Sequence, residues 1–502
     1  MPGKVYLIGA GPGDPGLLTL KGRAILERAD CVIYDFLAAK DLLRFCRPDA
    51  EKIFVGKRGG GARRPQQEIN QLLVAKAREM GTVARLKGGD PFIFGRGGEE
   101  ALALVEAGIP FEVVPGVTAG VAAPAYAGIP ITQRDAASSV SFLAGHEDPC
   151  KEESAIDWKA AAAASGTLIF FMGTRNLAAI AARLVAQGRA PETPVAVIHW
   201  GTRPSQQVVT GTLRDIADRA AALEPPTLII VGEVVNLREK LAWFERLPLF
   251  GRRIVITRTR EQAANLREAL AELGAQVIEI PTIEIRDPAS WEPLDNAIRR
   301  LEEFHYLLVT SANGVRSFLS RLRASGRDVR DLKGILIAAI GPATAAEFSK
   351  TGVKVDFIPQ EYRAEGLLEC LDSHDLKGKA FMIPRAKVAR DLVPQALRAR
   401  GARVEVVEAY ETVTPEIPAE ELERLLTPPP DLITFTSSST AANFAKLCGS
   451  RPIADVLRGV AVASIGPVTS ETARKLGLEV AIEARESTIP GLVEAIKKHF
   501  RP

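Results

Sequence analysis

The sequence predicts an α/β protein, and three observations support this class. Short runs rich in Val, Ile and Leu alternate with helical patterns rich in Ala, Leu, Glu and Arg. Two glycine-rich loops follow predicted strands in the first half, and the second half contains one set of loop patterns twice. The chain of 502 residues, 46% hydrophobic and 25% charged, is long enough for several globular domains.

The first half reads as two lobes, residues 1–114 and 115–243. In the first lobe we expect strands at Lys4–Ile8, Cys31–Tyr34, Lys52–Val55, Thr82–Leu86 and Phe111–Val114. The helices expected between them are Lys21–Arg28, Gln67–Arg78 and Glu99–Ala107, and helical structure is expected from about Leu17. In the second lobe, a mixed sheet is expected from the apolar runs Ser139–Leu143, Thr167–Met172, Pro194–His199 and Thr227–Val231. The segment Leu247–Gly251 reads as a linker, so the predicted halves are residues 1–247 and 248–502.

Two glycine loops point to a ligand site in the first half. The first glycine loop, Gly9–Thr19, contains Gly9, Gly11 and Gly13 in a spacing that differs from the GxGxxG of dinucleotide-binding proteins. Taken alone, it is explained equally well by a tight turn between strand and helix. The second glycine loop, Lys87–Glu100, makes the pair more specific and favours a site for a small cofactor.

The second half is an internal duplication of two α/β domains that are expected to face each other. The paired segments are Gly251–Arg258 with Gly378–Arg385, Leu308–Gly314 with Thr434–Thr440, and Ile340–Thr344 with Ile465–Thr469. Their hydroxyl-rich loops follow strands, which in open α/β sheets is the ligand edge. Simple capping of helices by Ser and Thr is the alternative explanation.

Composition also narrows the function classes. The net charge of +3 gives no reason to expect a nucleic-acid or membrane partner, and no apolar run approaches the ~20 residues of a membrane span. The N-terminal residues lead directly into a strand, so we expect a cytoplasmic protein without a signal peptide. The five cysteines and five histidines are scattered, which predicts neither disulfides nor a metal site.

Both halves resemble known families. Residues 3–240 look like uroporphyrinogen-III C-methyltransferase of the tetrapyrrole-methylase type, through the two glycine loops and the segments Val114–Ala119, Ala127–Thr132, Gly201-Thr202 and Gly232–Val235. Residues 251–500 resemble uroporphyrinogen-III synthase, through the repeated loops and Tyr410-Glu-Thr412. The resemblance implies a two-lobed methylase fold followed by two interleaved flavodoxin-like domains. Their implied ranges are 251–284 with 414–502 and 290–408, joined by a hinge at Ile283–Arg286 and Ala409–Val413.

The resemblance also implies the reactions. The second half would close hydroxymethylbilane to uroporphyrinogen III with inversion of the last pyrrole, and it would need no cofactor. The first half would then methylate this product at C2 and C7 with S-adenosyl-L-methionine, giving precorrin-2 and S-adenosyl-L-homocysteine. A homodimer through the methylase half is expected. Whether the product serves sirohaem, cobalamin or haem d1 biosynthesis stays open.

Site residues follow from the same resemblance. The implied cofactor contacts are Pro12, Gly88, Gly89, Asp90, Ile93, Thr118, Ala119, Met172 and Gly201. Asp90 suits the cofactor's ammonium group, whereas Met172 fits core packing as well as an adenine contact. Asp35 and Lys57 are the implied acid/base residues, and a carboxylate such as Asp35 that only caps a helix is the alternative.

The carboxylates of the implied tetrapyrrole substrate would be bound by basic and hydroxyl side chains. The basic residues expected to serve this purpose are Lys57, Arg58, Arg63, Arg64, Arg85, Lys87, Arg96 and Arg134, with Arg58 and Arg134 as the proposed substrate contacts. The implied substrate residues of the synthase half are Thr310, Ser311, Thr344, Thr436, Ser437, Ser438 and Thr469, with Asn313 in the same loops. Tyr410 would assist loss of the bilane hydroxyl, unless it is only a half-buried strand tyrosine. Gln133 stands where the methylase family usually has His. The amide retains hydrogen bonding at this position, and the consequence for a proton-transfer role there stays open.

Two other functions fit parts of the sequence. A protein methyltransferase of the same cofactor fold, similar to diphthine synthase, would be fused to an unrelated ligand-binding module. A two-lobed solute-binding protein is the non-enzymatic alternative for residues 251–502. The basic loops and the synthase-like half argue against the first alternative, and the missing export signal argues against the second.

Overall fold

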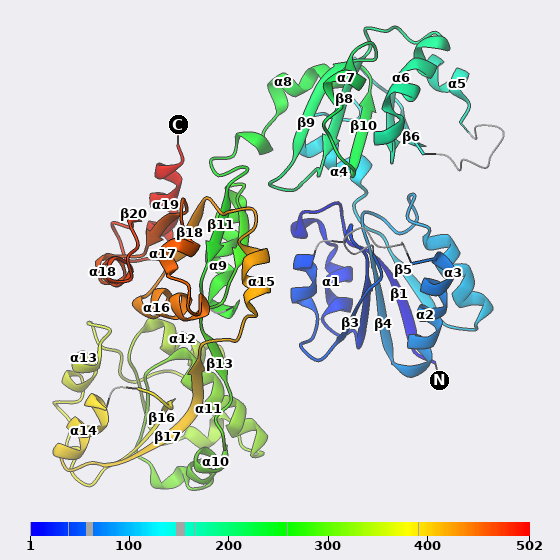
Figure 1. Ribbon diagram of the computed structural model, residues 1–502. Coiled ribbons are helices and arrows are strands. Elements are labelled where there is room, and N and C mark those ends of the chain that lie inside the picture. Colours follow the sequence, from blue (N-terminus) through cyan, green and yellow to red (C-terminus); the bar gives the residue numbers. More distant parts are fainter. Residues whose placement is uncertain are drawn as a thin grey trace. The chain divides into compact units, whose positions relative to one another are not determined.

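The computed structural model describes residues 2–38, 40–56, 64–146, 156–164, 166–258, 260–389 and 391–501 (Figure 1). Its contacts divide the chain into two compact units. The first unit comprises Met1–Arg253, Glu268–Val277 and Lys497–Pro502, and the second comprises Ile254–Arg267 and Ile278–Ile496. Within the described ranges, no helix is long and apolar enough to cross a membrane.

The first lobe of the first unit is a parallel five-stranded sheet in the order β3-β2-β4-β1-β5. Its strands are β1 (Lys4–Gly9), β2 (Cys31–Tyr34), β3 (Glu51–Phe54), β4 (Thr82–Lys87) and β5 (Phe111–Val114). One face packs against α1 (Leu20–Leu26), and the other packs against α2 (Gln66–Glu79) and α3 (Gly97–Glu106) (Figure 1). Alternate residues of β1 enter the two cores, as the pleat of a strand requires.

Helical structure after the first glycine loop begins later than expected. Residues Pro15–Leu17 form only the short 3-10 turn η1, and α1 starts at Leu20. The cause is Thr19, whose hydroxyl accepts the Gly22 backbone N–H at 3.1 Å and therefore caps the helix.

The second lobe contains a mixed sheet in the order β6-β7-β10-β8-β9. Its strands are β6 (Val140–Ala144), β7 (Thr167–Phe171), β8 (Pro194–His199), β9 (Gln207–Thr212) and β10 (Thr227–Val231). The sequence analysis missed β9, an edge strand that is largely outside the core and interrupted by glycine.

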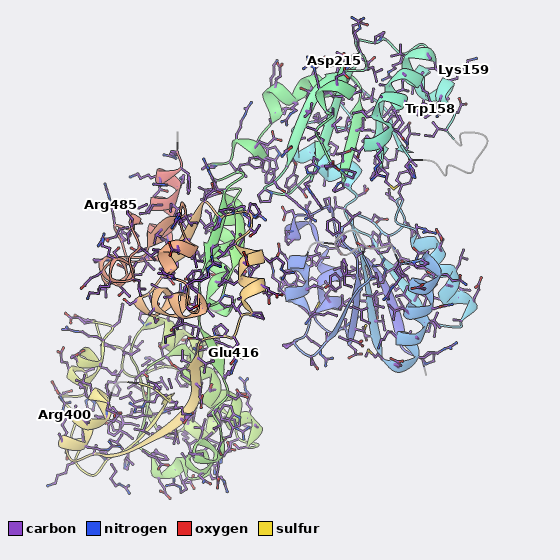
Figure 2. The ribbon with its side chains drawn as sticks, in the orientation of Figure 1. Trp158, Lys159, Asp215, Arg400, Glu416 and Arg485 are labelled. Atoms are coloured by element: carbon purple, nitrogen blue, oxygen red, sulfur yellow. The ribbon has the colours of Figure 1, made fainter. Side chains whose placement is uncertain are left out.

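Helices cover both faces of this mixed sheet. One face packs against α5 (Trp158–Ala163), α6 (Leu177–Ala186) and α7 (Ile216–Arg219), and the other packs against α4 (Ala119–Tyr126). Figure 2 shows Trp158 on α5, where its ring stacks on Phe170 with 6.0 Å between centroids. The short elements of the first unit are η2 (Lys40–Phe45), η3 (Thr174–Asn176), η4 (Glu233–Leu237), α8 (Arg238–Leu241) and η5 (Phe244–Arg246).

Two further five-stranded sheets follow. The first has the order β12-β11-β18-β19-β20, with β11 (Arg253–Ile256), β12 (Gln276–Glu279), β18 (Leu432–Phe435), β19 (Ala461–Ser464) and β20 (Val480–Glu483). Its helices are α9 (Arg260–Glu272), α15 (Ala419–Leu425), α16 (Ser438–Leu447), α17 (Ile453–Val456), α18 (Pro467–Lys475) and α19 (Ile489–His499).

The other sheet has the order β13-β17-β16-β14-β15, with β13 (Glu284–Arg286), β14 (Tyr306–Val309), β15 (Leu336–Ala339), β16 (Ala380–Ala386) and β17 (Arg403–Val413). One face packs against α10 (Glu292–Arg299), α11 (Ala312–Ala324) and α12 (Pro342–Ser349), and the other against α13 (Ala364–Glu369) and α14 (Leu392–Ala399). Two 3-10 turns, η6 (Leu301–Glu303) and η7 (Val329–Leu332), complete it.

Membership of these sheets confirms the interleaved fold. The duplicated strands β11 and β16 have exchanged places, because β11 pairs with β18 while β16 pairs with β14. Each sheet therefore combines strands from both copies of the repeat. The end of β17 pairs antiparallel with β13, which places Glu411–Val413 opposite Glu284–Arg286. The proposed hinge action of these two strands remains a prediction.

Candidate active sites

Three loops at the carboxyl ends of the first sheet's strands meet backbone to backbone. Gly11 and Gly89 exchange two hydrogen bonds, from Gly11 N to Gly89 O at 3.2 Å and from Gly89 N to Gly11 O at 2.8 Å. A Cβ at Gly9 would lie 2.4 Å from Gly116 Cα, so only glycine permits this approach. The two glycine loops and the loop that contains Gly116 therefore form one surface.

Asp90 fixes two of these loops in place. Its Oδ1 accepts the Phe92 backbone N–H at 2.8 Å, and its Oδ2 accepts that of Gly116 at 3.0 Å. Each carboxylate oxygen carries two lone pairs, so the side chain keeps acceptor capacity for a cationic ligand. Asp90 is thus both a structural link and an available anion.

The first glycine loop is also attached to the second lobe. The Tyr126 hydroxyl donates to Asp14 Oδ2 at 2.6 Å, and the Asp14 backbone N–H donates to Thr202 Oγ1 at 3.0 Å. Burial and the Asp14 hydrogen bond raise the pKa of Tyr126, so its phenol stays a donor. The sequence analysis missed this link, since Thr202 is distant in sequence and no local motif connects it to Asp14.

Backbone strain gathers around the same loops. In the described part of the chain, the non-glycine residues with positive φ are Phe94, Arg96, Met172, Trp200 and Thr202. Phe94 and Arg96 lie in the second glycine loop, Met172 is a predicted cofactor contact, and Trp200 and Thr202 flank the predicted contact Gly201. Strained backbone of this kind concentrates at ligand sites, because the surrounding structure must hold it there.

An apolar surface surrounds the loops, and it allows the fit of a cofactor to be tested. The exposed apolar side chains there are Phe36, Leu37, Phe92, Phe94, Val121 and Met172. Met172 is 54% exposed, which excludes the core-packing explanation for this residue. Open glycine backbone, an acidic side chain and exposed apolar groups suit a ligand with an ammonium group and an uncharged ring, as in S-adenosylmethionine.

The other predicted cofactor residues line the same loops. Pro12 and Ile93 are half-buried members of the two glycine loops. Thr118 caps α4 through its hydroxyl, which accepts the Gly120 N–H at 3.4 Å, and Ala119 is the first residue of that helix. A Cβ at Gly201 would lie 2.4 Å from that of Ala123, so this glycine is required by packing.

Asp35 directly follows β2 and is held from two sides. Its Oδ1 accepts the backbone N–H groups of Leu37 and Ala38 at 3.1 and 3.2 Å, so the capping role foreseen for it is present. Its Oδ2 pairs with Arg85 Nη2 at 3.3 Å. The turn that carries Asp35 also packs on the second glycine loop, because a Cβ at Gly88 would lie 2.5 Å from Leu37 Cβ.

A buried ionic cluster corrects part of the basic-residue prediction. Arg85 and Lys87 are 3% and 4% exposed, and both donate to Glu100 Oε1, at 3.1 and 2.8 Å. Glu100 itself is fully buried on α3. Burial, with the neighbouring Arg85 charge, lowers the pKa of Lys87. Arg85 therefore supports Asp35, Lys87 is held by Glu100, and the burial of both cations means that they are not surface contacts for substrate carboxylates.

The remaining basic residues differ in placement. Arg96 forms a bidentate pair with Glu99, with both distances 2.7 Å. Arg134 is exposed in a tight loop closed by hydrogen bonds between Gln133 and Ala137. Lys57, Arg58 and Arg63 lie outside the described residues.

In the second unit, Tyr410 meets the hydroxyl loop that follows β14. Its hydroxyl lies 3.0 Å from Ser311 Oγ, and Ser311 caps α11 by accepting the Gly314 N–H at 3.0 Å. Tyr410 is only 8% exposed and belongs to the core of its sheet. Thr310 stands between β14 and this cap, and the nearly buried Thr344 lies in the first turn of α12.

The duplicated loops form a second group on the other sheet. Ser437 caps α16 by accepting the Thr440 N–H at 3.2 Å, and the Ser438 hydroxyl donates to Val468 O at 3.2 Å. Thr436 precedes the cap, and Thr469 lies buried in the first turn of α18. The capping explanation therefore accounts for Ser311 and Ser437, whereas Thr310 and Thr436 each lie one residue before the cap.

This fold defines a two-part α/β protein, in which glycine loops meet at one edge of the first part and hydroxyl-bearing loops follow strands in the second. The family described as tetrapyrrole (corrin/porphyrin) methylases matches residues 4–217, and the family described as uroporphyrinogen-III synthase HemD matches residues 264–494.

Similar proteins cover both parts. The porphyrin biosynthesis protein HemD of Ruminiclostridium josui is 36% identical over 98% of this chain and 97% of its own. The uroporphyrinogen-III C-methyltransferase of Bacillus subtilis is 42% identical over 71% of this chain and 73% of its own. A crystal structure of uroporphyrin-III C-methyl transferase from Thermus thermophilus with S-adenyl homocysteine is 40% identical, covers 47% of this chain and 100% of that one, and has a TM-score of 0.41.

The chain therefore belongs to the family of the porphyrin biosynthesis protein HemD, and it joins a tetrapyrrole methylase half to a uroporphyrinogen-III synthase half.

Proposed function

We propose that the protein makes precorrin-2 from hydroxymethylbilane in two stages. The synthase half closes the bilane to uroporphyrinogen III, and the methylase half methylates this product at C2 and C7. The observation that carries the methylase assignment is the contact between the turn of Asp35 and Gly88, which joins a carboxylate to the glycine loops. The family membership of both halves supports the order of the reactions.

Residues of the three loops would hold S-adenosylmethionine. The proposed contacts are Pro12, Gly88, Gly89, Asp90, Ile93, Thr118, Ala119, Met172 and Gly201. Asp90 would pair with the ammonium group, and the apolar surface near Met172 would exclude water from an uncharged ring. When bound, the cofactor supplies an electrophilic methyl group on a sulfonium. Positioning by the loops is the chain's main contribution, since positioning supplies ~7–11 kcal/mol in favourable cases.

Asp35 is the proposed base in the methylase half. Methyl transfer to a substituted ring carbon leaves a positive charge on the tetrapyrrole. The charge is neutralised when another position of the macrocycle loses a proton, and a carboxylate near the loops accepts that proton. Hydrogen bonds from the turn and from Arg85 keep Asp35 in one orientation. Lys57, Arg58 and Arg134 remain proposed substrate and proton-transfer residues. We also propose a homodimer through this half and a cytoplasmic location.

In the synthase half, hydroxyl groups would hold one conformation of the bilane. Tyr410 is the proposed donor to the departing hydroxyl, and its 3.0 Å contact with Ser311 orients the phenol. The proposed substrate contacts are Thr310, Ser311, Thr344, Thr436, Ser437, Ser438 and Thr469. No redox or methyl chemistry occurs in this step, so hydroxyls and backbone N–H groups suffice.

Methyl transfer to a supplied tetrapyrrole tests the proposal. Purified protein is incubated with uroporphyrinogen III and S-adenosylmethionine labelled in its methyl group, and the tetrapyrrole is recovered for mass analysis. We expect a gain of two methyl groups on the tetrapyrrole. Label that appears only on added proteins would instead favour the protein methyltransferase alternative.

A further inference from the structure

Arg203 in the second lobe has buried donor groups without an acceptor. Its Nε and Nη2 atoms are shielded from solvent, and no residue in the described part of the chain accepts a hydrogen bond from either. Burial lowers the pKa of this guanidinium, and Asp41 is the acidic side chain that opposes the shift. A buried charge without a partner is unfavourable, so a protein retains one where a ligand supplies the opposite charge.

The Arg203 side chain is nevertheless held in place. Its guanidinium lies over the Trp200 ring, with 4.1 Å from Cζ to the ring centroid. On another side it packs on the first glycine loop, because a Cβ at Gly13 would lie 2.8 Å from both Cγ and Nε of Arg203. The fork of donors is therefore fixed before any ligand binds, which reduces the entropy lost on binding.

The location joins Arg203 to the methylase site. It directly follows Gly201 and the strained Thr202, which binds the Asp14 backbone. The Trp200 ring beneath it contacts Phe36 at 5.8 Å between centroids, and Phe36 is the neighbour of Asp35. Arg203 thus lies where the first glycine loop, the Asp35 turn and the loop at Gly201 converge.

Arg96 shows what this edge of a guanidinium binds in the same molecule. Nε and Nη2 form one edge of the guanidinium, and in Arg96 this edge binds both oxygens of Glu99 at 2.7 Å. In Arg203 the corresponding edge is buried and unoccupied by any described side chain.

We propose that Arg203 is a carboxylate-binding residue of the methylase half, which pairs through Nε and Nη2 with one carboxylate of a bound ligand. The inference rests on the proposed function, whose ligands carry two kinds of carboxylate. One kind belongs to the eight acidic side chains of the tetrapyrrole, and the other is the single carboxylate of the cofactor's amino acid end. The planar fork specifies carboxylate in both cases.

Equilibrium binding to Arg203→Gln distinguishes the two sources. The dissociation constant for uroporphyrin III, the stable oxidised octacarboxylate, is measured by fluorescence titration, and that for S-adenosylhomocysteine by calorimetry. We expect one of the two constants to rise roughly 10- to 100-fold, as for loss of a charge-assisted pair, and the other to stay within about twofold. The constant that rises identifies the ligand.

Two further variants complete the test. Arg214→Gln is the matched control, because Arg214 is 68% exposed and pairs with Glu192 on the surface, so both constants should match the wild type. Arg203→Lys keeps the charge without the planar fork, so this variant should also bind the ligand more weakly. It provides the test if Arg203→Gln does not fold. Folded Arg203 variants that bind both ligands like the wild type would overturn the proposal. A wild type that binds neither ligand would contradict the proposed function itself.

Discussion

Replacing Glu100 by alanine should destabilise the first unit strongly. The Glu100 side chain is fully buried, and its Oε1 accepts from Lys87 at 2.8 Å and from Arg85 at 3.1 Å. Without it, Lys87 loses its anionic partner, and Arg85 keeps the Asp35 carboxylate at 3.3 Å and the Leu86 carbonyl at 3.0 Å. Breaking a buried pair in this way costs about 3–5 kcal/mol. A domain of this size loses roughly 2–4 °C of melting temperature per kcal/mol, so we expect a fall of roughly 6–20 °C.

The adjacent Glu99 provides the control. It is 49% exposed and pairs with Arg96 on the surface, where such a pair contributes less than about 1 kcal/mol. Differential scanning calorimetry of the full chain, run on Glu100→Ala, Glu99→Ala and the wild type, measures the difference. Equal melting shifts in the two variants would refute the conclusion that the buried cluster holds this lobe together.

Three other predictions concern single residues. Asp90→Asn removes the anion and keeps one of the two oxygens that accept from the loops, so calorimetry should show S-adenosylmethionine binding weakened roughly tenfold; unchanged affinity would leave Asp90 a loop residue only. Tyr410→Phe loses the hydroxyl that meets Ser311 and should slow type III formation roughly 10²–10³-fold, so isomer analysis should find type I product; a wild-type yield of type III would reduce Tyr410 to packing. Lys21 holds the pKa of Glu112 at about 2, so unfolded chains bind more protons between that value and pH 4.5, and wild-type stability rises with pH there. In Glu112→Gln, the stability measured by acid unfolding should rise less with pH over this range than in the wild type. A dependence of stability on pH equal to that of the wild type would contradict the prediction.

Much of the fold follows from the sequence because it is encoded in local patterns. The strands Cys31–Tyr34 and Phe111–Val114 have the bounds that their apolar runs indicate. Both glycine loops follow strands, as the sequence indicates, and the structure shows that they meet at the Gly11–Gly89 bridge. The exchange of duplicated strands followed from family resemblance, and periodicity alone does not predict it.

The sequence was less informative about side chains whose partners come from other elements. Lys87 reads as a surface cation, but its partner Glu100 reaches it from the start of α3, and composition does not reveal that contact. The unpartnered edge of Arg203 likewise becomes visible only when every nearby acceptor is placed. Local signals therefore indicated the candidate site, whereas the charge pairing within it required the structure.

Conversion of hydroxymethylbilane by the intact chain tests the central claim most directly. The bilane closes without inversion in the absence of a synthase, so the isomer formed reports on the second half, and added methyl groups report on the first. Without S-adenosylmethionine we predict uroporphyrinogen of type III, and with it a type III product carrying two additional methyl groups. Type I product at the uncatalysed rate, or a type III product that gains no methyl group, would contradict the account.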